Sequence, residues 1–279
     1  MGVRCPVCER PVVAGDTYCE ACGHPLGAPA CAACGAAAVD ADGYCERCGV
    51  RQPTGRDHAE LVLPGGAAAV TDRGLRRARN EDAMALREAG ASIVSVVCDG
   101  VGSSPRADEA SAVAVETAAA ALARGLPDEE AFALAGRAVT KLATSLDDAP
   151  ACTYVSVVAE PAGRVRLAWA GDTRAYLLPG GELLTEDDVV PTGEITAWLG
   201  ADADTAAPHM RTFTPQSTPQ GPGLLLVCSD GLWRYLDGYA FPTSGTPVEM
   251  AREMLRHALD SGGQDNVTIV VIPLGDPHE

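Results

Sequence analysis

The fold is decided by a stretch that reads Ile93-Val94-Ser95-Val96-Val97-Cys98-Asp99-Gly100. Its first six residues have the length and β-branched composition of a buried strand, and the Asp-Gly pair that follows is a turn signal. The same criteria predict further strands over residues 67–71, 83–87, 153–159, 164–170, 175–178, 224–228 and 267–272. These strands come in consecutive runs, which favours antiparallel sheets with helices packed outside. The sequence therefore predicts an α+β fold, an antiparallel β-sandwich flanked by helices.

Three predicted helices complete this picture. Residues 108–124 and 128–146 are rich in Ala and Leu, and Gly125-Leu126-Pro127 separates them. A later helix has a strong start signal, because Thr246, Pro247 and Glu249 have the spacing of a capping box with proline at the first helical position.

Four aspartates share one placement at the end of a predicted strand. Asp99, Asp172 and Asp230 each follow an apolar run, and Asp265 stands just before the last strand. Carboxylates gathered at one rim of a sheet repel one another unless a cation balances them, and an all-oxygen shell selects Mg²⁺ or Mn²⁺. The alternative is that each Asp-Gly pair only marks a turn.

An arginine cluster offers the complementary charge. Arg73, Arg76, Arg77 and Arg79 crowd into seven residues directly before Asn80-Glu81-Asp82. A guanidinium matches phosphate oxygens in a bidentate way, so this cluster indicates a phosphomonoester site. A solvated edge strand is the alternative for most of these arginines.

The cysteines set a second region apart. Eight of the 11 cysteines form four Cys-x-x-Cys pairs within the first 50 residues: Cys5/Cys8, Cys19/Cys22, Cys31/Cys34 and Cys45/Cys48. Two such pairs complete a tetrahedral S₄ shell, so the repeat predicts two structural Zn²⁺ ions. A disulfide framework is the alternative, disfavoured because no signal peptide is apparent. The segment resembles the double zinc ribbon family.

The charge of this segment limits its partners. Residues 1–50 hold three Arg against six Asp or Glu, which argues against nucleic-acid binding and favours a protein-docking or bracing module. Four thiolates already fill each zinc shell, so we expect His24 to be a surface residue rather than a ligand.

The whole chain of 279 residues carries a formal net charge of −17. This charge excludes a broad basic surface for binding nucleic acid or anionic lipid. The sequence contains no run of about twenty apolar residues and no signal peptide, so we expect a cytoplasmic protein that binds neither membrane nor nucleic acid. We expect a double zinc ribbon over 1–50, a linker over 51–66 and one large domain over 67–275.

Five blocks of the large domain resemble the signature motifs of the metal-dependent PPM, or type 2C, serine/threonine protein phosphatases. In chain order they are Gly74-Leu-Arg-Arg-Ala-Arg-Asn-Glu-Asp-Ala83, Val97-Cys-Asp-Gly-Val-Gly102, Gly171-Asp-Thr-Arg-Ala-Tyr176, Cys228-Ser-Asp-Gly-Leu-Trp233 and Gly263-Gln-Asp-Asn-Val-Thr268. The resemblance implies a binuclear Mn²⁺ or Mg²⁺ centre that activates water. It assigns Asp99 as the bridging ligand, the Gly100 carbonyl to the second metal, and Asp230 and Asp265 to the first.

The resemblance also implies further roles. Asp172, with Asp230, matches a third metal site of the family. Asp82 matches the acidic residue that orients the metal-bound water. Arg77 matches the arginine that binds phosphate. Glu81 and Asn266, beside these positions in the same blocks, are expected in the surrounding shell. The implied substrates are phosphoproteins, targets of a Ser/Thr kinase.

Two departures from the family pattern stand out. Val101-Gly102 follow Asp99-Gly100 where animal members carry a His, so the leaving group must take its proton from water or an outer residue. Residues 185–200 are shorter than the usual flap, which leaves room for the ribbons to select substrates. The rival functions are a phosphoprotein-binding pseudophosphatase and a zinc-ribbon nucleic-acid binder. Cys98 and Cys228 are expected to be small buried residues rather than nucleophiles.

Overall fold

The computed structural model describes residues 3–5, 7–13, 16, 18–24, 26, 31, 34–40, 43–49, 52, 55–145, 147–161, 163–201, 203, 207–215 and 223–275. The chain divides into two compact units, Met1–Gly55 and Arg56–Glu279. The first unit has little regular structure: β1 (Val3–Arg4) and β2 (Pro11–Val12) form one short antiparallel ladder. It is the unit that carries the cysteine pairs.

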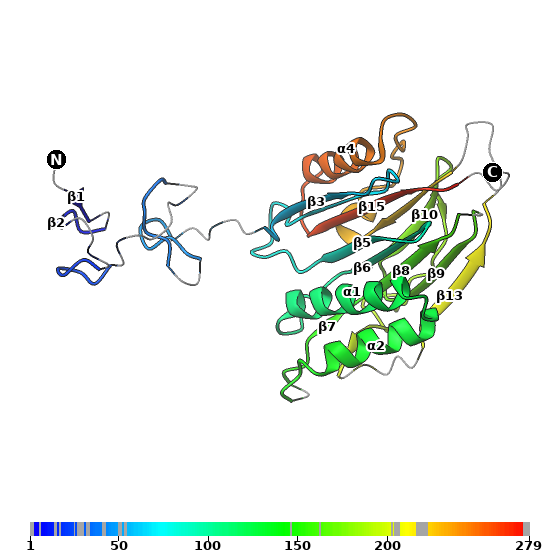
Figure 1. Cartoon of the computed structure of the whole chain (residues 1–279), viewed down its shortest axis with the longest axis horizontal. Coiled ribbons are helices and arrows are strands. Elements are labelled where there is room, and N and C mark those ends of the chain that lie inside the picture. Colours follow the sequence, from blue (N-terminus) through cyan, green and yellow to red (C-terminus); the bar gives the residue numbers. More distant parts are fainter. Residues whose placement is uncertain are drawn as a thin grey trace. The chain divides into compact units, whose positions relative to one another are not determined.

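The second unit contains two main antiparallel sheets (Figure 1). The six-stranded sheet has the order β11 (Glu182–Leu183), β10 (Arg174–Leu178), β14 (Leu224–Cys228), β15 (Val267–Pro273), β4 (Ala68–Asp72) and β3 (His58–Val62). The five-stranded sheet has the order β13 (His209–Phe213), β9 (Val165–Ala170), β8 (Tyr154–Ala159), β6 (Ser92–Cys98) and β5 (Ala83–Ala89). A short ladder joins β7 (Ala151–Cys152) to β12 (Leu199–Gly200).

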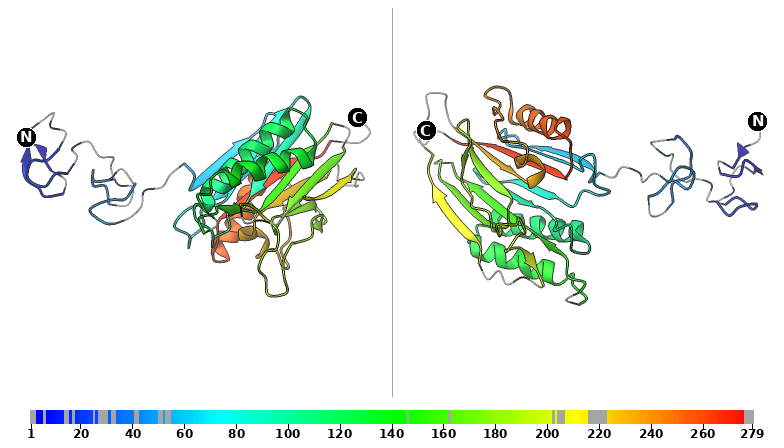
Figure 2. Two further views of the ribbon diagram at one scale, coloured as in Figure 1. Left: turned by 90° about the horizontal axis from the view of Figure 1, so that it is seen from below. Right: turned by 180° about the vertical axis from the view of Figure 1, so that it is seen from behind.

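Helices cover both outer faces of this sandwich. Figure 2 shows α1 (Ala107–Ala123) and α2 (Asp128–Thr140) lying on the five-stranded sheet, and α4 (Pro247–Asp260) on the six-stranded one. Three apolar layers result, one under each helical cover and one between the sheets. The predicted α+β sandwich is confirmed.

The capping box predicted at the late helix is present. The side chain of Thr246 accepts a hydrogen bond from the backbone N–H of Glu249, and the Glu249 side chain accepts one from the backbone N–H of Thr246. These two bonds satisfy donors that the first turn of a helix leaves free.

The predicted helix over 128–146 is too long. It ends at Thr140, and the backbone N–H of Asp148 bonds to Ser145 while that of Thr144 bonds back to Asp148. Short polar side chains favour such local bonds over a helix, which explains the early end. Leu146 lies outside the described residues.

The predicted linker over 51–66 is partly wrong. His58–Val62 forms the edge strand β3, paired along its length with β4. An edge strand is half exposed and tolerates charged residues, so its sequence can look like a linker. Arg51, Pro53 and Thr54 lie outside the described residues.

Three strands end just before an aspartate. Strands β6 and β9 of one sheet end just before Asp99 and Asp172, and strand β14 of the other sheet ends just before Asp230. Within the described residues, no helix combines the length and apolar character needed to cross a membrane.

Candidate functional site

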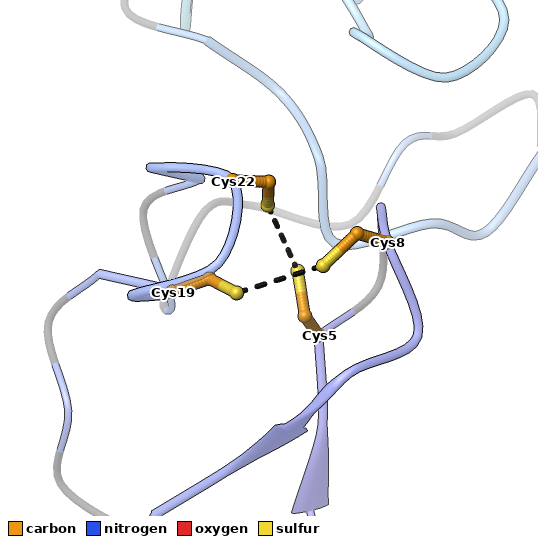
Figure 3. A group of neighbouring side chains, drawn as sticks. All are labelled: Cys5, Cys8, Cys19 and Cys22. Carbon is orange, nitrogen blue, oxygen red and sulfur yellow. Dashed lines mark hydrogen bonds between the residues drawn. The ribbon is translucent and has the colours of Figure 1, made fainter.

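The first cysteine quartet forms a compact thiol cluster. The Sγ atoms of Cys5 and Cys22 lie 3.7 Å apart, and those of Cys8 and Cys19 lie 3.6 Å apart. Figure 3 shows the two knuckles turning their sulfurs toward one point. Zn–S bonds of about 2.3 Å in a tetrahedron place sulfurs about 3.8 Å apart, whereas a disulfide requires about 2.05 Å. The geometry therefore fits zinc, and the cysteines are free thiols.

The second quartet repeats this arrangement. Cys31 and Cys48 are 3.7 Å apart at sulfur, as are Cys34 and Cys45. In each quartet all four ligand atoms lie within 4.8 Å of one another. The eight cysteines predicted from their spacing as zinc ligands thus lie in two sets of four.

His24 is not the surface residue that we expected. It is buried, with Nδ1 2.6 Å from a carboxylate oxygen of Glu46 and Nε2 2.9 Å from the carbonyl oxygen of Ala37. Burial alone would lower the pKa of His24, but its bonds to Ala37 and Glu46 outweigh burial and raise it. The histidine packs the first ribbon against the second, because Ala37 and Glu46 belong to the second repeat.

Six of the predicted phosphatase residues line one cavity of about 220 Å³ in the second unit. Its lining includes Arg77, Asp99, Gly100, Asp172, Asp230 and Asp265. Asp99 and Asp172 follow strands β6 and β9 of the five-stranded sheet, while Asp230 follows β14 and Asp265 precedes β15 of the six-stranded sheet. The cavity therefore lies at one end of the sandwich, where both sheets contribute.

Two arginines hold the carboxylates on one side of the cavity. Arg77 lies 2.5 Å from Asp265 Oδ2, and Arg234 lies 2.5 Å from Asp230 Oδ2 and 3.9 Å from Asp265. Among the described residues, only the cysteine quartets bring three or more metal-ligand atoms within 4.8 Å of one another. The aspartate oxygens are spread more widely around the cavity.

The electrostatics of the aspartates suit a cation. Burial raises the pKa of Asp230 to about 7, with repulsion from Asp265 adding to the shift. Burial and the neighbouring carboxylates, first among them Asp82, raise the pKa of Asp99 well above its usual range, and burial raises that of Asp172. Asp230 Oδ1 is buried and has no hydrogen-bond partner in the structure. An all-oxygen donor set under mutual repulsion fits a hard divalent ion.

Asp82 is buried and is not among the residues that line this cavity. It is 3% exposed, and Ser229 Oγ donates to its Oδ2 at 2.7 Å. Its Oδ1 is buried without a hydrogen-bond partner in the structure. Burial raises the pKa of Asp82 to about 6. The side chain thus keeps one oxygen available beside Asp99, its electrostatic neighbour.

The backbone of Asp99 is held from both sides by Thr153, a residue that sequence reasoning missed. The Asp99 N–H donates to Thr153 Oγ1 at 2.9 Å, and the Thr153 N–H donates to the Asp99 carbonyl at 2.8 Å. Thr153 also lines the cavity. Thr153 stands directly before β8, and its place at the start of the predicted strand 153–159 was the available signal.

Asn266 and Glu81, expected around the site, fix the arginine loop. Asn266 Nδ2 donates to the carbonyls of Arg73 and Arg79 at 2.8 Å each, and its Oδ1 accepts from the Glu81 N–H at 2.8 Å. Gly74 is required at the start of this loop, because its φ is +72° and a Cβ there would lie 2.1 Å from the Asp265 carbonyl oxygen. The loop therefore packs directly against the segment that carries Asp265.

Arg234 is the second lining residue that sequence reasoning missed. It stands one helical turn after Asp230, at the end of the short helix α3 (Asp230–Trp233). That spacing was the signal in the sequence. Cys98 and Cys228, in contrast, are fully buried in their strands, as expected.

Comparisons with known proteins agree with this geometry. Residues 75–267 match the family described as Protein phosphatase 2C, and residues 5–49 match the family described as Double zinc ribbon. The chain is 31% identical over 253 residues to the serine/threonine protein phosphatase PstP of Mycobacterium tuberculosis, in a match that covers 78% of this chain and 46% of PstP. The chain thus spans less than half the length of the curated relatives it matches.

Solved structures share the fold. A PPM Ser-Thr phosphatase of Mycobacterium smegmatis in complex with cacodylate matches with a TM-score of 0.61 at 27% identity, covering 77% of this chain and all (100%) of that one. The catalytic domain of PstP in complex with two manganese ions matches with a TM-score of 0.60 at 25% identity, covering 78% of this chain and 100% of that one.

Proposed function

The chain belongs to the protein phosphatase 2C family, and on that premise we propose that it is an enzyme that hydrolyses phosphoserine and phosphothreonine in proteins with divalent metal ions. The observation that carries the proposal is the shared cavity, in which buried aspartates from both sheets face two arginines. Such a cavity combines ligands for hard cations with cationic groups for a phosphate.

The aspartates are the proposed holders of the cations. Asp99, Asp230, Asp265 and the Gly100 carbonyl would hold two Mn²⁺ or Mg²⁺ ions, and Asp172 with Asp230 a third. The match to the manganese-bound catalytic domain of PstP supports this assignment. When bound, these ions supply Lewis acidity that activates water and neutralises charge on the phosphoryl oxygens.

The arginines are the proposed phosphate-binding groups. Arg77 and Arg234 reach the cavity from separate elements, and both side chains are about half exposed, so an incoming phosphate can contact them. A guanidinium offers two parallel N–H donors to the equatorial oxygens of a phosphoryl group. The two residues would orient the phosphate for in-line attack.

Asp82 is proposed to orient the attacking water. Its Oδ2 is held by Ser229 and its Oδ1 has no hydrogen-bond partner in the structure, so one acceptor is fixed in place beside Asp99. Among the described residues that line the cavity there is no histidine. The leaving-group oxygen would therefore take its proton from solvent.

The zinc ribbons are proposed to dock or brace a protein partner. Their acidic charge and the short flap over 185–200 support a role in choosing substrates rather than in binding nucleic acid. Deletion of residues 1–50 should lower activity on native phosphoproteins while leaving p-nitrophenyl phosphate hydrolysis intact. Unchanged activity on the phosphoproteins would refute this role.

The full chain with Mn²⁺ and p-nitrophenyl phosphate tests the enzymatic proposal. We expect manganese-dependent hydrolysis that falls by about 10³-fold in Asp230→Asn, since removal of one group that stabilises transition-state charge costs about 10²–10³. Asp237→Asn is the control, because Asp237 is an exposed turn aspartate away from the cavity lining. No turnover by the wild-type chain would favour the phosphoprotein-binding pseudophosphatase instead.

A further inference from the structure

A second cavity adjoins the aspartate cavity in the phosphatase unit. It measures about 450 Å³ and shares the lining residues Val101 and Ile195 with its neighbour. We call it the flanking groove; the residues that matter below are Ser104, Asp147, Ala151, Glu194, Ile195 and Trp198. Its size falls within the range of ligand-binding cavities in proteins.

The groove has an apolar wall and an acidic rim. Ile195 and Trp198 are half-buried and form the wall, while Ala151 is buried at the base. The exposed residues Asp147 and Glu194, from two separate segments of chain, also line the groove, and we call them its rim. No Lys, Arg or His is among the described residues that line it.

The two rim carboxylates are not neutralised by neighbouring side chains. Neither Asp147 nor Glu194 has an ion pair with any residue that the structure describes, whereas the adjacent Asp148 pairs with Arg106 at 2.9 Å. The Thr192 hydroxyl donates to the Glu194 carboxylate and lowers its pKa, which keeps it ionised. The rim therefore presents two negative charges over an apolar surface.

Hydrogen bonds hold the segments that form the groove. Asp188 Oδ2 accepts from the Gly171 N–H at 2.9 Å, and the Asp188 carbonyl accepts from Thr196 at 2.7 Å, so the flap segment is tied beside the aspartate cavity. Across the groove, the Ala151 N–H donates to Ser104 Oγ at 3.1 Å. A preorganised groove loses little entropy when it binds a ligand.

We propose that the flanking groove is a subsite for a lysine or arginine side chain of the phosphoprotein substrate, close in sequence to the phosphorylated residue. The proposal rests on the proposed function of the adjoining cavity. The aliphatic stem of the basic residue packs on Ile195 and Trp198, and its cation lies between Asp147 and Glu194. Because the cavities share lining residues, the basic residue lies within about three positions of the phosphoserine, at about 3.5 Å per extended residue.

The test measures kcat/KM of the full chain with Mn²⁺ on a set of phosphoserine peptides. Each peptide carries one lysine at a position from three residues before to three residues after the phosphoserine, in a neutral background; matched peptides carry alanine or norleucine there. We expect lysine to raise kcat/KM about tenfold over alanine at one or two positions, the size of two partly exposed ion pairs. Norleucine should give a smaller gain.

Two double variants assign this preference to the groove. Asp147→Asn with Glu194→Gln should abolish the lysine preference and leave p-nitrophenyl phosphate hydrolysis unchanged. Glu129→Gln with Glu130→Gln removes two exposed carboxylates from α2, outside the groove lining, and should keep the preference. This control separates the subsite from general attraction to an acidic protein.

Several results would overturn the proposal. They are equal rates for lysine and alanine at every position, equal gains from norleucine and lysine, or a preference that survives the Asp147/Glu194 variant. If the chain hydrolyses no p-nitrophenyl phosphate, the enzymatic proposal fails separately. The same peptides are then compared for binding by fluorescence anisotropy, where a lysine preference lost in that variant still supports the subsite.

Discussion

The cysteine quartets and the aspartate cavity are both built for cations, but they relate to the fold in opposite ways. In the ribbons, sulfurs 3.6–3.7 Å apart already have the spacing of a zinc tetrahedron, and few apolar side chains surround them. In the phosphatase unit, three apolar layers hold the sandwich together, and Asp99 and Asp230 lie at its end with raised pKa values. We therefore expect the first unit to depend on its metal to fold, and the second to fold in spite of its proposed metal-binding residues.

This difference concerns how each unit obtains the free energy that it needs to fold. A small region cannot bury enough apolar surface, so metal coordination supplies its folding free energy. A large domain gains enough stability from its apolar core to tolerate a group of carboxylates that repel one another, and such a group can serve in catalysis. The predictions below test the contrast between the two units.

Zinc removal should have the largest effect and should be confined to the ribbons. Structural zinc contributes about 10–16 kcal/mol in zinc-finger peptides, so Cys31→Ser should unfold the second ribbon and lower the bound zinc from two ions to one. Zinc content and limited proteolysis of residues 1–55 measure this.

Cys152→Ser is the matched control, because Cys152 is a buried cysteine of the phosphatase unit. It should leave two zinc ions bound. Loss of manganese-dependent activity toward p-nitrophenyl phosphate in Cys31→Ser would contradict the independence of the two units.

The next effect concerns Arg77 in the aspartate cavity. Arg77→Ala should lower kcat/KM for p-nitrophenyl phosphate about 100-fold, because the phosphate loses a bidentate partner. Arg77→Lys should restore only part of this, since an ammonium lacks the guanidinium fork. Arg76→Ala is the control from the same loop but outside the cavity lining; an equal loss there would show a general charge effect instead.

Asp230→Asn should stabilise the phosphatase unit while it destroys activity. The raised pKa of Asp230 means that its charged form is disfavoured in the folded state. Without divalent ions, removal of that charge should raise the melting temperature by about 3–6 °C, for about 1–2 kcal/mol. Tryptophan fluorescence reports this unit alone, because Trp169, Trp198 and Trp233 all belong to it. A lower melting temperature would show that the aspartate cavity is not under strain.

The pH dependence of stability should have a definite sign. The pKa of Asp82 is raised to about 6 and that of Asp230 to about 7, against about 4 in the unfolded chain. Between about pH 4 and 7 these two carboxyl groups bind more protons in the folded state than in the unfolded state. The part of the stability that depends on them, without divalent ions, should therefore fall as pH rises from about 4 to 7 and level off above. Melting temperatures at pH 5 and 7.5 measure this fall, and Asp230→Asn should reduce it. A rise over the same range would contradict the raised pKa values.

The sequence predicts the interior of the fold better than its edges. The strands between other strands are mostly apolar and β-branched, as in β6, β8 and β15, so composition alone predicts them. Edge strands β3 and β13 are half exposed and carry polar residues, and they look like loops or linkers. Their pairing depends on a neighbouring strand that is distant in the sequence.

The same contrast holds for the site. The aspartates could be predicted because each stands at one end of a buried strand, and the cysteines because their spacing repeats. Arg234 and Thr153 were missed although each has a signal in the sequence, because neither stands within a motif block and their contacts with Asp230 and Asp99 are seen only in the structure. His24 was expected on the surface because four thiolates already fill its zinc shell. Its contacts with Glu46 and Ala37 of the second repeat bury it instead, and the sequence does not show such contacts.

Anomalous diffraction from a crystal of the full chain grown with Mn²⁺ tests the central claim most directly. We expect manganese peaks coordinated by Asp99, Asp230 and Asp265, and zinc peaks within the two cysteine quartets. Manganese absent from these aspartates at saturating concentration, with the domain folded, would contradict the account.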